Sequence, residues 1–457
     1  MKALVWFRRD LRLQDNSALA MALASGQSVE AVYVHSIDGE WCTGSASKWY
    51  LHHSLLALQK DLAAINISLT CFCGSSSSVL PDYANKKGIS NIYWNRVVDP
   101  QQEHADHELT QKLMRIKIDY AICDDDCLLM PEQGYKKDGT AYRVFTPFWK
   151  TVRERMESIS YETRLHAKPE AIGRPLDYDP LEVEQLDLLA GFSWYTKLHQ
   201  YWIPGEISAH DRLHEFIDKQ LAGYDISRDI PALNHTSRLS AALHFGEISA
   251  ARIYSLCQQI ELHEQSEVTR RGVRRFLAEI GWREFARHVL HAFPETSVKS
   301  LNTRFEQQGF WQIDQQNDFL RMWQQGVTGI DIIDAGMREL WETGTMHNRV
   351  RMLTASFLTK NLGIHWLKGA RWFWDTLVDA DLASNTLGWQ WVAGCGTDAA
   401  PYYRIFNPQT QANKFDSERH YINRWLGRDS ARPAMVDLKT SREAALMRYQ
   451  SIIRIDH

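Results

Sequence analysis

Residues 379–391, DADLASNTLGWQW, place two aspartates close to two tryptophans. Aspartate is rarely fully buried in proteins, whereas tryptophan is usually buried to a large extent. If this segment is helical, Asp381, Asn385 and Trp389 share one face because they are four residues apart. Gly388 lowers the helix propensity of the segment. The composition predicts a segment that meets a charged partner and a buried aromatic environment within a few residues.

A second segment, residues 346–360, supplies a candidate partner for these acids. Asn348, Arg351 and Met352 are spaced i, i+3, i+4 and therefore share a helical face. An arginine on a face otherwise made of Met, Ala and Leu needs a counter-charge or a ligand. We expect Asp379 or Asp381 to provide that counter-charge.

Residues 270–293 read as a helix rich in arginine and aromatic side chains. Arg275, Glu279 and Arg283 follow an i, i+4, i+8 spacing, which is typical of an exposed ladder of ion pairs. Trp282 lies three residues after Glu279. An acid beside a tryptophan and arginines equally fits a cleft that binds a planar ligand. The spacing leaves both interpretations open.

A run of hydroxyl and basic residues, Thr236 to Ser240, precedes an apolar helical segment. Free backbone N–H groups and hydroxyls at the start of a helix bind anions such as phosphate. Serine and threonine are also ordinary helix N-caps without any ligand. The segment alone favours the ordinary cap slightly.

The elements that must position these residues fall into two parts. Short apolar runs alternate with helical patterns over the first 130 residues or so, at 2–7, 29–35, 67–73, 89–95 and 119–125. This alternation predicts a parallel, doubly wound α/β sheet. No G-x-G-x-x-G follows the first run, and no G-x-x-x-x-G-K-[ST] occurs, so an ordinary dinucleotide or nucleotide phosphate loop is not expected. We expect domains at 1–129 and 204–457, the second all-helical, joined by a connector at 130–203 rich in Pro, Gly and charge.

Composition sets limits on the class of protein. The 457 residues have a net charge of −4, so a nucleic-acid-binding face would have to be a local basic cluster. No apolar run is long enough to span a bilayer, and the start of the chain does not read as a signal peptide. The seven cysteines lack metal-ligand spacing, so we expect free thiols in a cytoplasm and no metal site. Ten of the 17 tryptophans lie from Trp282 onward, which favours stacking or redox roles in the second half.

Together these segments resemble the photolyase/cryptochrome flavoprotein family. The resemblance runs nearly end to end, from LVWFRRDLRLQDNSAL through YDISRDIPALNHTSRLS, EIGWREF and TGTMHNRVRM to DADLASNTLGWQWVAGCGTDAAPYYRIFNPQTQANKFD. It implies an α/β antenna domain followed by a helical domain that holds FAD. One departure is Thr345, which stands where many members of the family carry an aromatic residue.

The resemblance also separates repair from signalling. Glu279 matches the carboxyl group that contacts a cyclobutane pyrimidine dimer, Trp282 and Trp391 the aromatic pair that holds the flipped dimer, and Asn348 and Met352 further dimer contacts. Asn385 matches the asparagine that faces the flavin N5 in photolyases, where plant cryptochromes usually carry aspartate. The resemblance therefore implies light-driven repair of UV-damaged DNA. A cryptochrome photoreceptor is the alternative, and a light-independent flavoprotein oxidoreductase is a more distant one.

Further roles come from the same resemblance. DNA contacts are expected at Arg228, Arg349, Arg404 and Gln411. Electron relays from the flavin to the surface are expected at Trp389, Trp366 and Trp311, with a small insertion between Trp311 and Trp323. The FAD site is expected to comprise Tyr224, Thr236, Ser237, Arg238, Leu239, Ser240, Phe276, Arg283, Arg351, Asp379, Ala380, Asp381 and Asn385.

The N-terminal domain is expected to carry a second, light-harvesting chromophore, which in this family is a folate, a deazaflavin or a flavin. Glu103 matches a folate-binding acid. We expect a monomer in a bacterial cytoplasm, with damaged DNA as its partner and no contact with a membrane.

Overall fold

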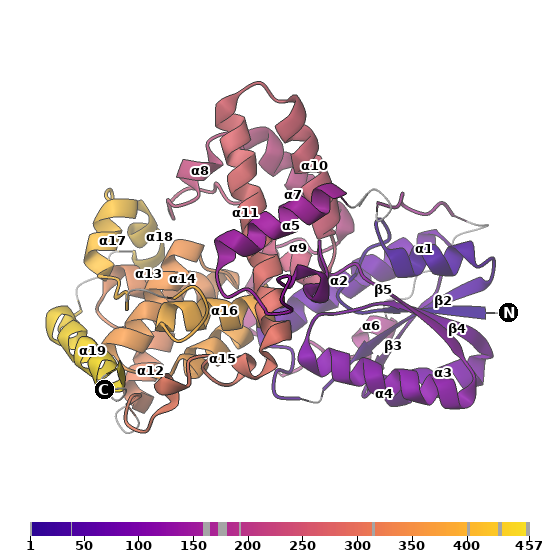
Figure 1. Cartoon of the computed structure of the whole chain (residues 1–457), viewed down its shortest axis with the longest axis horizontal. Helices are drawn as coiled ribbons and strands as arrows, with labels where there is room; N and C mark the ends of the chain where they lie inside the picture. Colours follow the sequence, from indigo (N-terminus) through magenta and orange to yellow (C-terminus); the bar gives the residue numbers. More distant parts are fainter. Residues whose placement is uncertain are drawn as a thin grey trace.

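The computed structural model describes residues 2–37, 39–158, 165–171, 181–191, 193–312, 316–399, 403–427 and 432–453. A five-stranded parallel sheet occupies one end of the molecule (Figure 1). Its strands are β1 (Lys2–Phe7), β2 (Ser28–His35), β3 (Leu69–Cys73), β4 (Ile89–Asn95) and β5 (Asp119–Cys123). They run in the order β3-β2-β1-β4-β5, which confirms the predicted doubly wound sheet.

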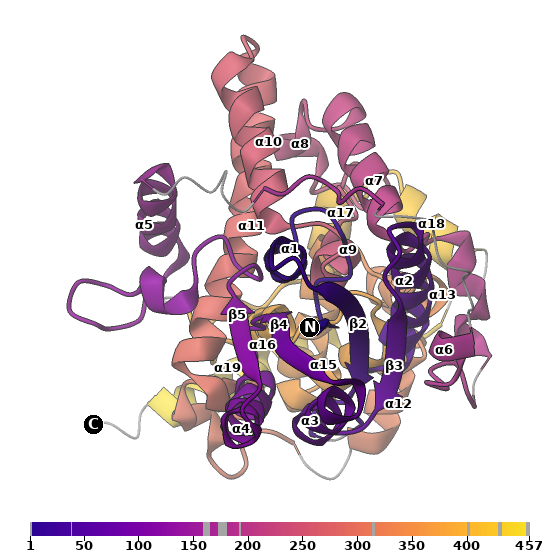
Figure 2. The ribbon, with the colours of Figure 1, turned by 90° about the vertical axis from the view of Figure 1, so that its right-hand side faces the viewer.

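Helices cover both faces of this sheet because successive side chains of a strand point to opposite faces. Ala3, Val5 and Phe7 of β1 face the helices α1 (Ser17–Ala24) and α2 (Ser45–Ala64). Leu4 and Trp6 face α3 (Ser76–Lys87) and α4 (Pro100–Ile116). Figure 2 shows the sheet with α3 and α4 lying together on one side of it. The first strand is thus buried on both faces, as expected for the centre of a parallel sheet.

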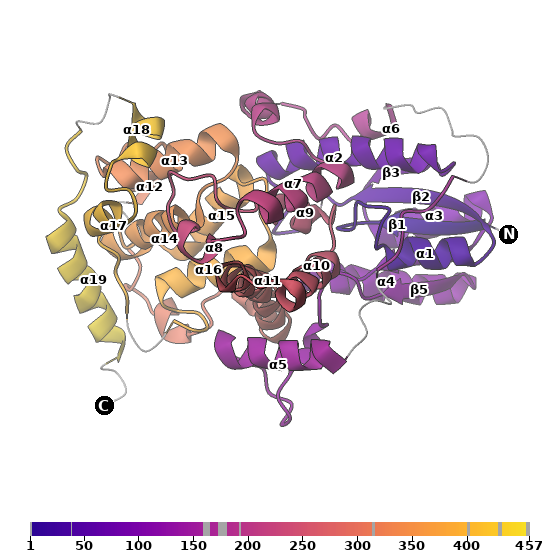
Figure 3. The ribbon, with the colours of Figure 1, turned by 90° about the horizontal axis from the view of Figure 1, so that it is seen from above.

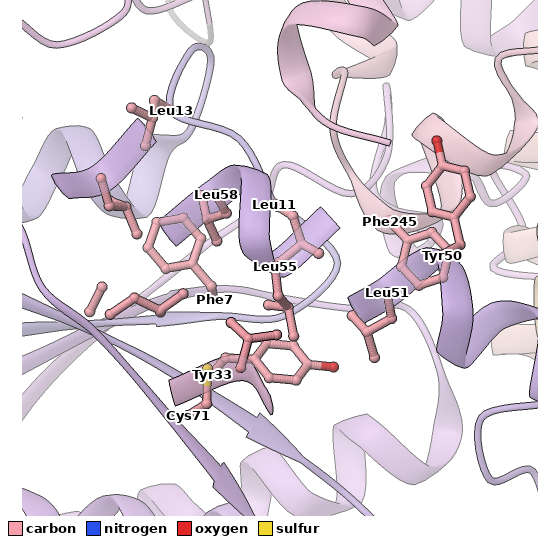
Figure 4. Packing of buried hydrophobic residues seen from close by; sticks show 14 of the residues in the cluster. Phe7, Leu11, Leu13, Tyr33, Tyr50, Leu51, Leu55, Leu58, Cys71 and Phe245 are labelled. Atoms are coloured by element: carbon pink, nitrogen blue, oxygen red, sulfur yellow. The ribbon is translucent and has the colours of Figure 1, made fainter. Parts of the chain in front are cut away.

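The core between the sheet and α2 continues into the helical half of the chain. Figure 4 shows this core, in which Tyr50 of α2 lies beside Phe245 of α9 (Ser240–Phe245). The two rings stack with centroids 5.0 Å apart and planes 10° apart. Glu247 is buried at the same boundary and accepts hydrogen bonds from Tyr50 and from the backbone N–H of Gly205. The two halves therefore share one packed interface.

The connector differs from its prediction. Residues 130–203 were expected to lack regular structure, yet they contain α5 (Phe145–Ser158), α6 (Leu181–Glu184) and the short 3-10 helices η1 (Pro131–Gly134) and η3 (Trp194–Gln200). Pro147 falls in the first turn of α5, where a missing N–H costs nothing. Helix α5 packs across α11 (Glu267–Ala292), the 26-residue helix in the middle of the molecule, which is seen nearly end-on in Figure 3.

The remaining chain is helical, as predicted. Its elements are α7 (Glu206–Lys219), α8 (Tyr224–Ser227), α10 (Ala250–His263), η4 (Pro294–Ser297), η5 (Thr303–Glu306), α12 (Gln316–Gln324), α13 (Asp331–Thr343), α14 (Asn348–Ser356), the π-helical turn η6 (Phe357–Asn361), α15 (Trp366–Thr376), α16 (Leu382–Ala393), α17 (Pro408–Phe415), α18 (His420–Leu426) and α19 (Leu438–Ile453). The last of these packs against the rest of the molecule through Ala445 and Ile452, which are buried.

Two findings concern the described residues alone. None of the helices in this part of the chain is long and apolar enough to cross a membrane. Nor do three or more His, Cys, Asp or Glu side chains gather there in a way that would hold a metal ion.

Candidate functional site

Helix α16 begins at the opening motif. Asp381 is its N-cap, because its side chain accepts a hydrogen bond from the backbone N–H of Ser384 at 2.9 Å. The helix then extends through Trp391, so the predicted common face of Asp381, Asn385 and Trp389 is confirmed. Asn385 is half-buried, and its Nδ2 donates to the carbonyl of Ala370 in α15 at 3.0 Å. This bond fixes the amide, with Nδ2 toward the carbonyl of Ala370 and Oδ1 directed away from it.

The predicted partner of Arg351 is confirmed. Its guanidinium lies 3.0 Å from the carboxylate of Asp379, which is 8% exposed. The same side chain donates to the carbonyl of Met346 at 2.7 Å and to the hydroxyl of Thr345 at 3.2 Å. Thr345, the one departure from the family pattern, is therefore an additional acceptor for this arginine.

Asp381 belongs to a second, buried charge network. Its carboxylate lies 3.3 Å from Arg287 and 3.6 Å from His244. Arg287 also lies 3.1 Å from Asp126, at the end of the sheet domain. Burial pushes the pKa of Asp381 up, but Arg287 and a hydrogen bond with His244 outweigh this and hold it well below its usual range. The same opposition between burial and two arginines leaves the pKa of Asp126 lowered.

Sequence reasoning missed most of this network. Arg287 lies four residues after Arg283 on α11, so its position on the same face was readable. Its partners come from elements remote in sequence, and no local pattern joins Asp126 or His244 to them. Arg283 itself pairs with Asp126 at 3.0 Å and with Glu284 at 2.9 Å. The ladder expected on α11 therefore includes Arg275 and Glu279, 3.4 Å apart, but Arg283 lies in the buried network instead.

Glu279 has two arginine partners. Its carboxylate accepts a hydrogen bond from Arg228, which is 8% exposed, and lies near the more exposed Arg275. The Glu279 side chain itself is 27% exposed, so solvent reaches its carboxylate beside the two arginines. The contact of Arg228 with DNA stays a prediction, since its guanidinium here is committed to Glu279.

Two half-buried tryptophans flank this region on adjacent helices. Trp282 of α11 stacks on Phe145 with ring centroids 3.9 Å apart. Trp391 of α16 donates its Nε1–H to the carbonyl of Asp398 at 3.1 Å, and the exposed Arg404 lies over its ring at 5.9 Å. Helices α11 and α16 are in direct contact.

A small cavity of about 30 Å³ borders Trp391 and Arg404. It is also lined by Lys360 of η6, whose Nζ lies over the ring of Tyr403 at 3.1 Å. Burial holds the pKa of Lys360 well below its usual range.

Asn348 is exposed at the first turn of α14, and Met352 is half-buried one turn later. Arg349 lies 2.7 Å from Asp229, and its guanidinium lies over the ring of Phe415 at 4.4 Å. Gln411 of α17 is half-buried. The predicted roles of these residues toward DNA stay predictions.

The chemistry of the predicted diphosphate site fits an anion. The guanidiniums of Arg238 and Arg212 both lie over the ring of Trp202, 4.6 and 5.4 Å from its centroid. Among the residues that the structure describes, no carboxylate is within ion-pair distance of either guanidinium. Burial and the neighbouring Arg212 lower the pKa of Arg238. Two guanidiniums that form no ion pair with any described residue, next to the half-buried hydroxyls of Thr236 and Ser237, suit the phosphates of FAD.

Other members of the predicted FAD site lie around this region. Tyr224 and Phe276 pack edge to face at 5.8 Å inside the core, while Leu239 and Ala380 are buried and Ser240 is exposed. The expected helix after Ser240 is only six residues long, and Leu239 rather than a hydroxyl residue is its N-cap. The start of this short helix is therefore a weak candidate for binding the phosphates, and the guanidiniums are the better one.

The predicted relays form a path of aromatic contacts in part. Trp389 is 3% exposed and meets Phe373 at 5.0 Å and Trp323 at 6.2 Å. Trp366 is fully buried and donates to Ser300 at 3.0 Å. Its neighbour His365 lies 4.9 Å from Trp311, whereas Trp323 packs against Trp389. Trp311 therefore lies beside His365, which also contacts Trp366, and the order of the relays stays a prediction.

Glu103 of α4 lies between the two halves of the molecule. It is 2.5 Å from Arg96 and 3.7 Å from His291 of α11. Burial raises its pKa, but hydrogen bonds with His291 and Arg96 outweigh this and lower it. The role of Glu103 as a chromophore contact stays a prediction.

Comparisons with known proteins agree across nearly the whole chain. Residues 276–445 match the family model described as the FAD binding domain of DNA photolyase, and residues 3–171 match the DNA photolyase model. A deoxyribodipyrimidine photo-lyase of Agrobacterium fabrum is 41% identical over 93% of this chain and 86% of that protein. Cryptochrome-2 of Arabidopsis thaliana is 34% identical over 93% of this chain and 70% of its own length. A crystal structure of a bacterial class III photolyase from Agrobacterium tumefaciens superposes with a TM-score of 0.88 at 36% identity, covering 99% of this chain and 98% of that one.

Proposed function

The chain belongs to the DNA photolyase/cryptochrome family, and from this premise we propose that it is a deoxyribodipyrimidine photo-lyase that repairs cyclobutane pyrimidine dimers with light. One observation carries the proposal. The contacting helices α11 and α16 each present a half-buried tryptophan, Trp282 and Trp391, and α11 adds the carboxyl group of Glu279. This set suits a pair of stacked, uncharged rings with carbonyl groups better than it suits a nicotinamide or a sugar.

FAD is the cofactor, and in its reduced form it supplies the light-driven electron that splits the cyclobutane ring and afterwards takes that electron back. Arg351 and Asp379 would hold the edge of the isoalloxazine, where the fixed positive charge of Arg351 would favour an anionic ring. Asn385, whose Nδ2 donates to the carbonyl of Ala370, would offer its side-chain oxygen to N5. Arg238, with the hydroxyls of Thr236 and Ser237, would bind the diphosphate.

The dimer has to leave the duplex to reach these residues, because its reacting bonds are buried in the base stack. Trp282 and Trp391 provide stacking surfaces for the flipped dimer. Arg228 and Arg275 hold the carboxyl group of Glu279, which would face the pyrimidine carbonyls of the flipped dimer. Asn348 and Met352 complete the pocket from α14.

The phosphates of the damaged strand are held by Arg349, Arg404 and Gln411, with Arg228 as a further candidate. Such contacts are salt-dependent and blind to sequence, which suits an enzyme that must act wherever a lesion forms. The exposed guanidinium of Arg404 over Trp391 supports this role.

Trp389, Trp366 and Trp311 carry electrons from the surface to oxidised flavin. The burial of Trp389 and Trp366 and the contact of Trp311 with His365 support this order. We also propose an antenna chromophore in domain 1–129 near Glu103, the connector at 130–203, the catalytic domain at 204–457, and a monomer in a bacterial cytoplasm. The seven cysteines, all free thiols, suit such a reducing compartment.

The alternative is a cryptochrome photoreceptor, which the likeness to the Arabidopsis cryptochrome favours. Three oligonucleotides distinguish the functions: one with a single cyclobutane thymine dimer, one with a (6-4) lesion and one undamaged. The reduced, FAD-loaded protein should bind and repair the first, and leave the (6-4) lesion intact. If the protein binds and repairs none of the three oligonucleotides in preference to the others, the repair proposal is wrong and the photoreceptor function is favoured.

A further inference from the structure

The connector helix α5 builds a column of parallel rings against α11. Phe145, its first residue, stacks face to face on Trp282 with centroids 3.9 Å apart and planes 8° apart. Trp149, one turn later, continues the column at 6.5 Å from Phe145 with planes 12° apart. One face of the Trp282 indole is therefore covered by the connector, and Phe285 contacts the ring in a T-shaped arrangement with centroids 5.8 Å apart, which leaves the remaining surface of the indole for a ligand.

The column is anchored rather than loosely placed. Phe148 lies 5.2 Å from Phe285 and 4.9 Å from His288 of α11, and Val152 and Met156 are buried in the same core. Gly281 permits the close approach, since a methyl group there would lie 2.6 Å from Cδ2 of Trp149. Helix α5 is thus fixed on α11 at the residue directly before Trp282.

The same segment also reaches the second tryptophan. The carbonyl of Arg143 accepts a hydrogen bond from the backbone N–H of Asp398 at 3.1 Å. The carbonyl of Asp398 in turn accepts from Nε1 of Trp391 at 3.1 Å. Residues 143–149 are therefore linked to both aromatic walls, to Trp282 by stacking and to Trp391 through one residue.

A flat ring held on one face cannot tilt or turn freely about its side-chain bonds. A binding surface that is already in its bound orientation loses less entropy when the ligand arrives. Stacking on a neighbouring ring also gives the indole a preferred plane, which an aliphatic neighbour does not. The arrangement thus fixes the plane of Trp282 before any base is flipped.

We propose that Phe145 is a positioning residue for lesion recognition, which orients Trp282 and so sets the preference for damaged over undamaged DNA. This inference rests on the proposed function, because it takes Trp282 as a wall of the dimer pocket. It makes the connector a part of the substrate site, although sequence patterns predicted only a link between domains.

The test compares Phe145→Leu and Phe145→Met, which keep an apolar side chain but lose the ring, with Phe145→Tyr, which keeps it. Val144→Ala is the matched control, because Val144 is the preceding residue and is 47% exposed. Dissociation constants are measured in the dark for FAD-loaded protein with a dimer-containing duplex and with the same undamaged duplex. Dimer loss per absorbed photon is then measured at saturating DNA.

Both ring-less variants should bind the dimer duplex roughly three- to tenfold more weakly, with the affinity for undamaged DNA unchanged. Phe145→Tyr and Val144→Ala should match the parental protein. The photon yield at saturation and the FAD content should stay the same in all four variants. This pattern would identify a positioning role for Phe145, because a general loss of structure would also lower the photon yield and the FAD content.

Two results would overturn the inference while repair itself stands: dimer affinity equal to the parental value in both ring-less variants, or equal losses for damaged and undamaged DNA. The dissociation constants of Trp282→Ala for the damaged and undamaged duplexes are measured in the same series. If the parental protein itself shows no preference for the dimer, the proposed function has failed and Phe145 is not the cause.

Discussion

Arg351 and Asp379 form an ion pair of 3.0 Å that ties α14 to the segment leading into α16. Asp379 is buried, Arg351 is partly exposed, and Thr345 and Met346 accept the remaining donors of the guanidinium. The pair joins the two sequence segments that had seemed to need each other, an arginine on an apolar face and an acid in a tryptophan-rich run.

Replacing Asp379 by Asn should weaken FAD binding by roughly tenfold or more, because it leaves a partly buried guanidinium without its counter-charge. The measurement is the dissociation constant for FAD from fluorescence titration of the stripped protein. Thr345→Val is the control, since it removes one neutral acceptor worth about 1 kcal/mol. Equal losses in both variants would show that the charge of Asp379 does not matter.

Substitution of Arg287 should be strongly destabilising. Arg287→Met leaves Asp126 and Asp381 buried without their shared cation, and breaking such a buried pair costs about 3–5 kcal/mol. Arg275→Met removes an arginine that is 45% exposed and should cost no more than about 1 kcal/mol. Urea unfolding of both variants compares the two free energies, and similar values would contradict the buried network as a stabilising element.

Stability should fall as pH rises through neutrality because of Glu339. Burial raises its pKa to about 7, above the value of an exposed glutamate, although Tyr421 and the N–H of His347 donate to it. The folded state therefore binds more protons than the unfolded state between about pH 4.5 and 7. The associated stability is complete at low pH and lost as pH rises through 7.

Glu339→Gln should remove this slope, which amounts to at most roughly 3 kcal/mol. The free energy of unfolding is measured for both proteins at several pH values between these limits. The difference between parental protein and variant should change with pH in this window, and a constant difference would show that Glu339 does not titrate there.

Trp366→Phe should slow the light-driven reduction of oxidised FAD strongly, because it breaks the middle of the predicted path, and Trp311→Phe should slow it as well. Repair by chemically reduced protein should be unaffected, since that step does not use the path. Trp323→Phe is a control of similar size, because Trp323 contacts Trp389 but lies off the path. Slower photoreduction in the Trp323 variant alone would mean that electrons take a different route.

Much of the fold was readable because local patterns decide it. The five strands follow from β-branched and aromatic runs, and all five were located. Helix α5 was missed because Pro147 and the surrounding polar residues look like a loop, while its stability comes from Phe148 and Val152 packing on α11. The helix exists through tertiary contact, which local sequence does not report.

The residues of the site likewise divide into those that local patterns predict and those that depend on the fold. The Arg351–Asp379 pair was predicted because an arginine on an apolar face must be compensated, so only the partner had to be found. The ladder on α11 was partly wrong, since spacing shows that Arg283 shares a face with Glu279 but not that Asp126 of another domain lies closer to it. The roles of Arg287 and His244 could not be predicted, because their partners lie on elements that are remote in sequence and meet only in the folded structure.

Light-driven splitting of cyclobutane pyrimidine dimers can be tested with one sample of FAD-loaded, chemically reduced protein and an excess of a duplex that carries a single thymine dimer, divided between blue light and darkness. Dimers should disappear only in the illuminated half, over many turnovers, with the flavin still reduced at the end. Intact dimers in the light, from protein that has bound both FAD and the duplex, would contradict light-driven repair.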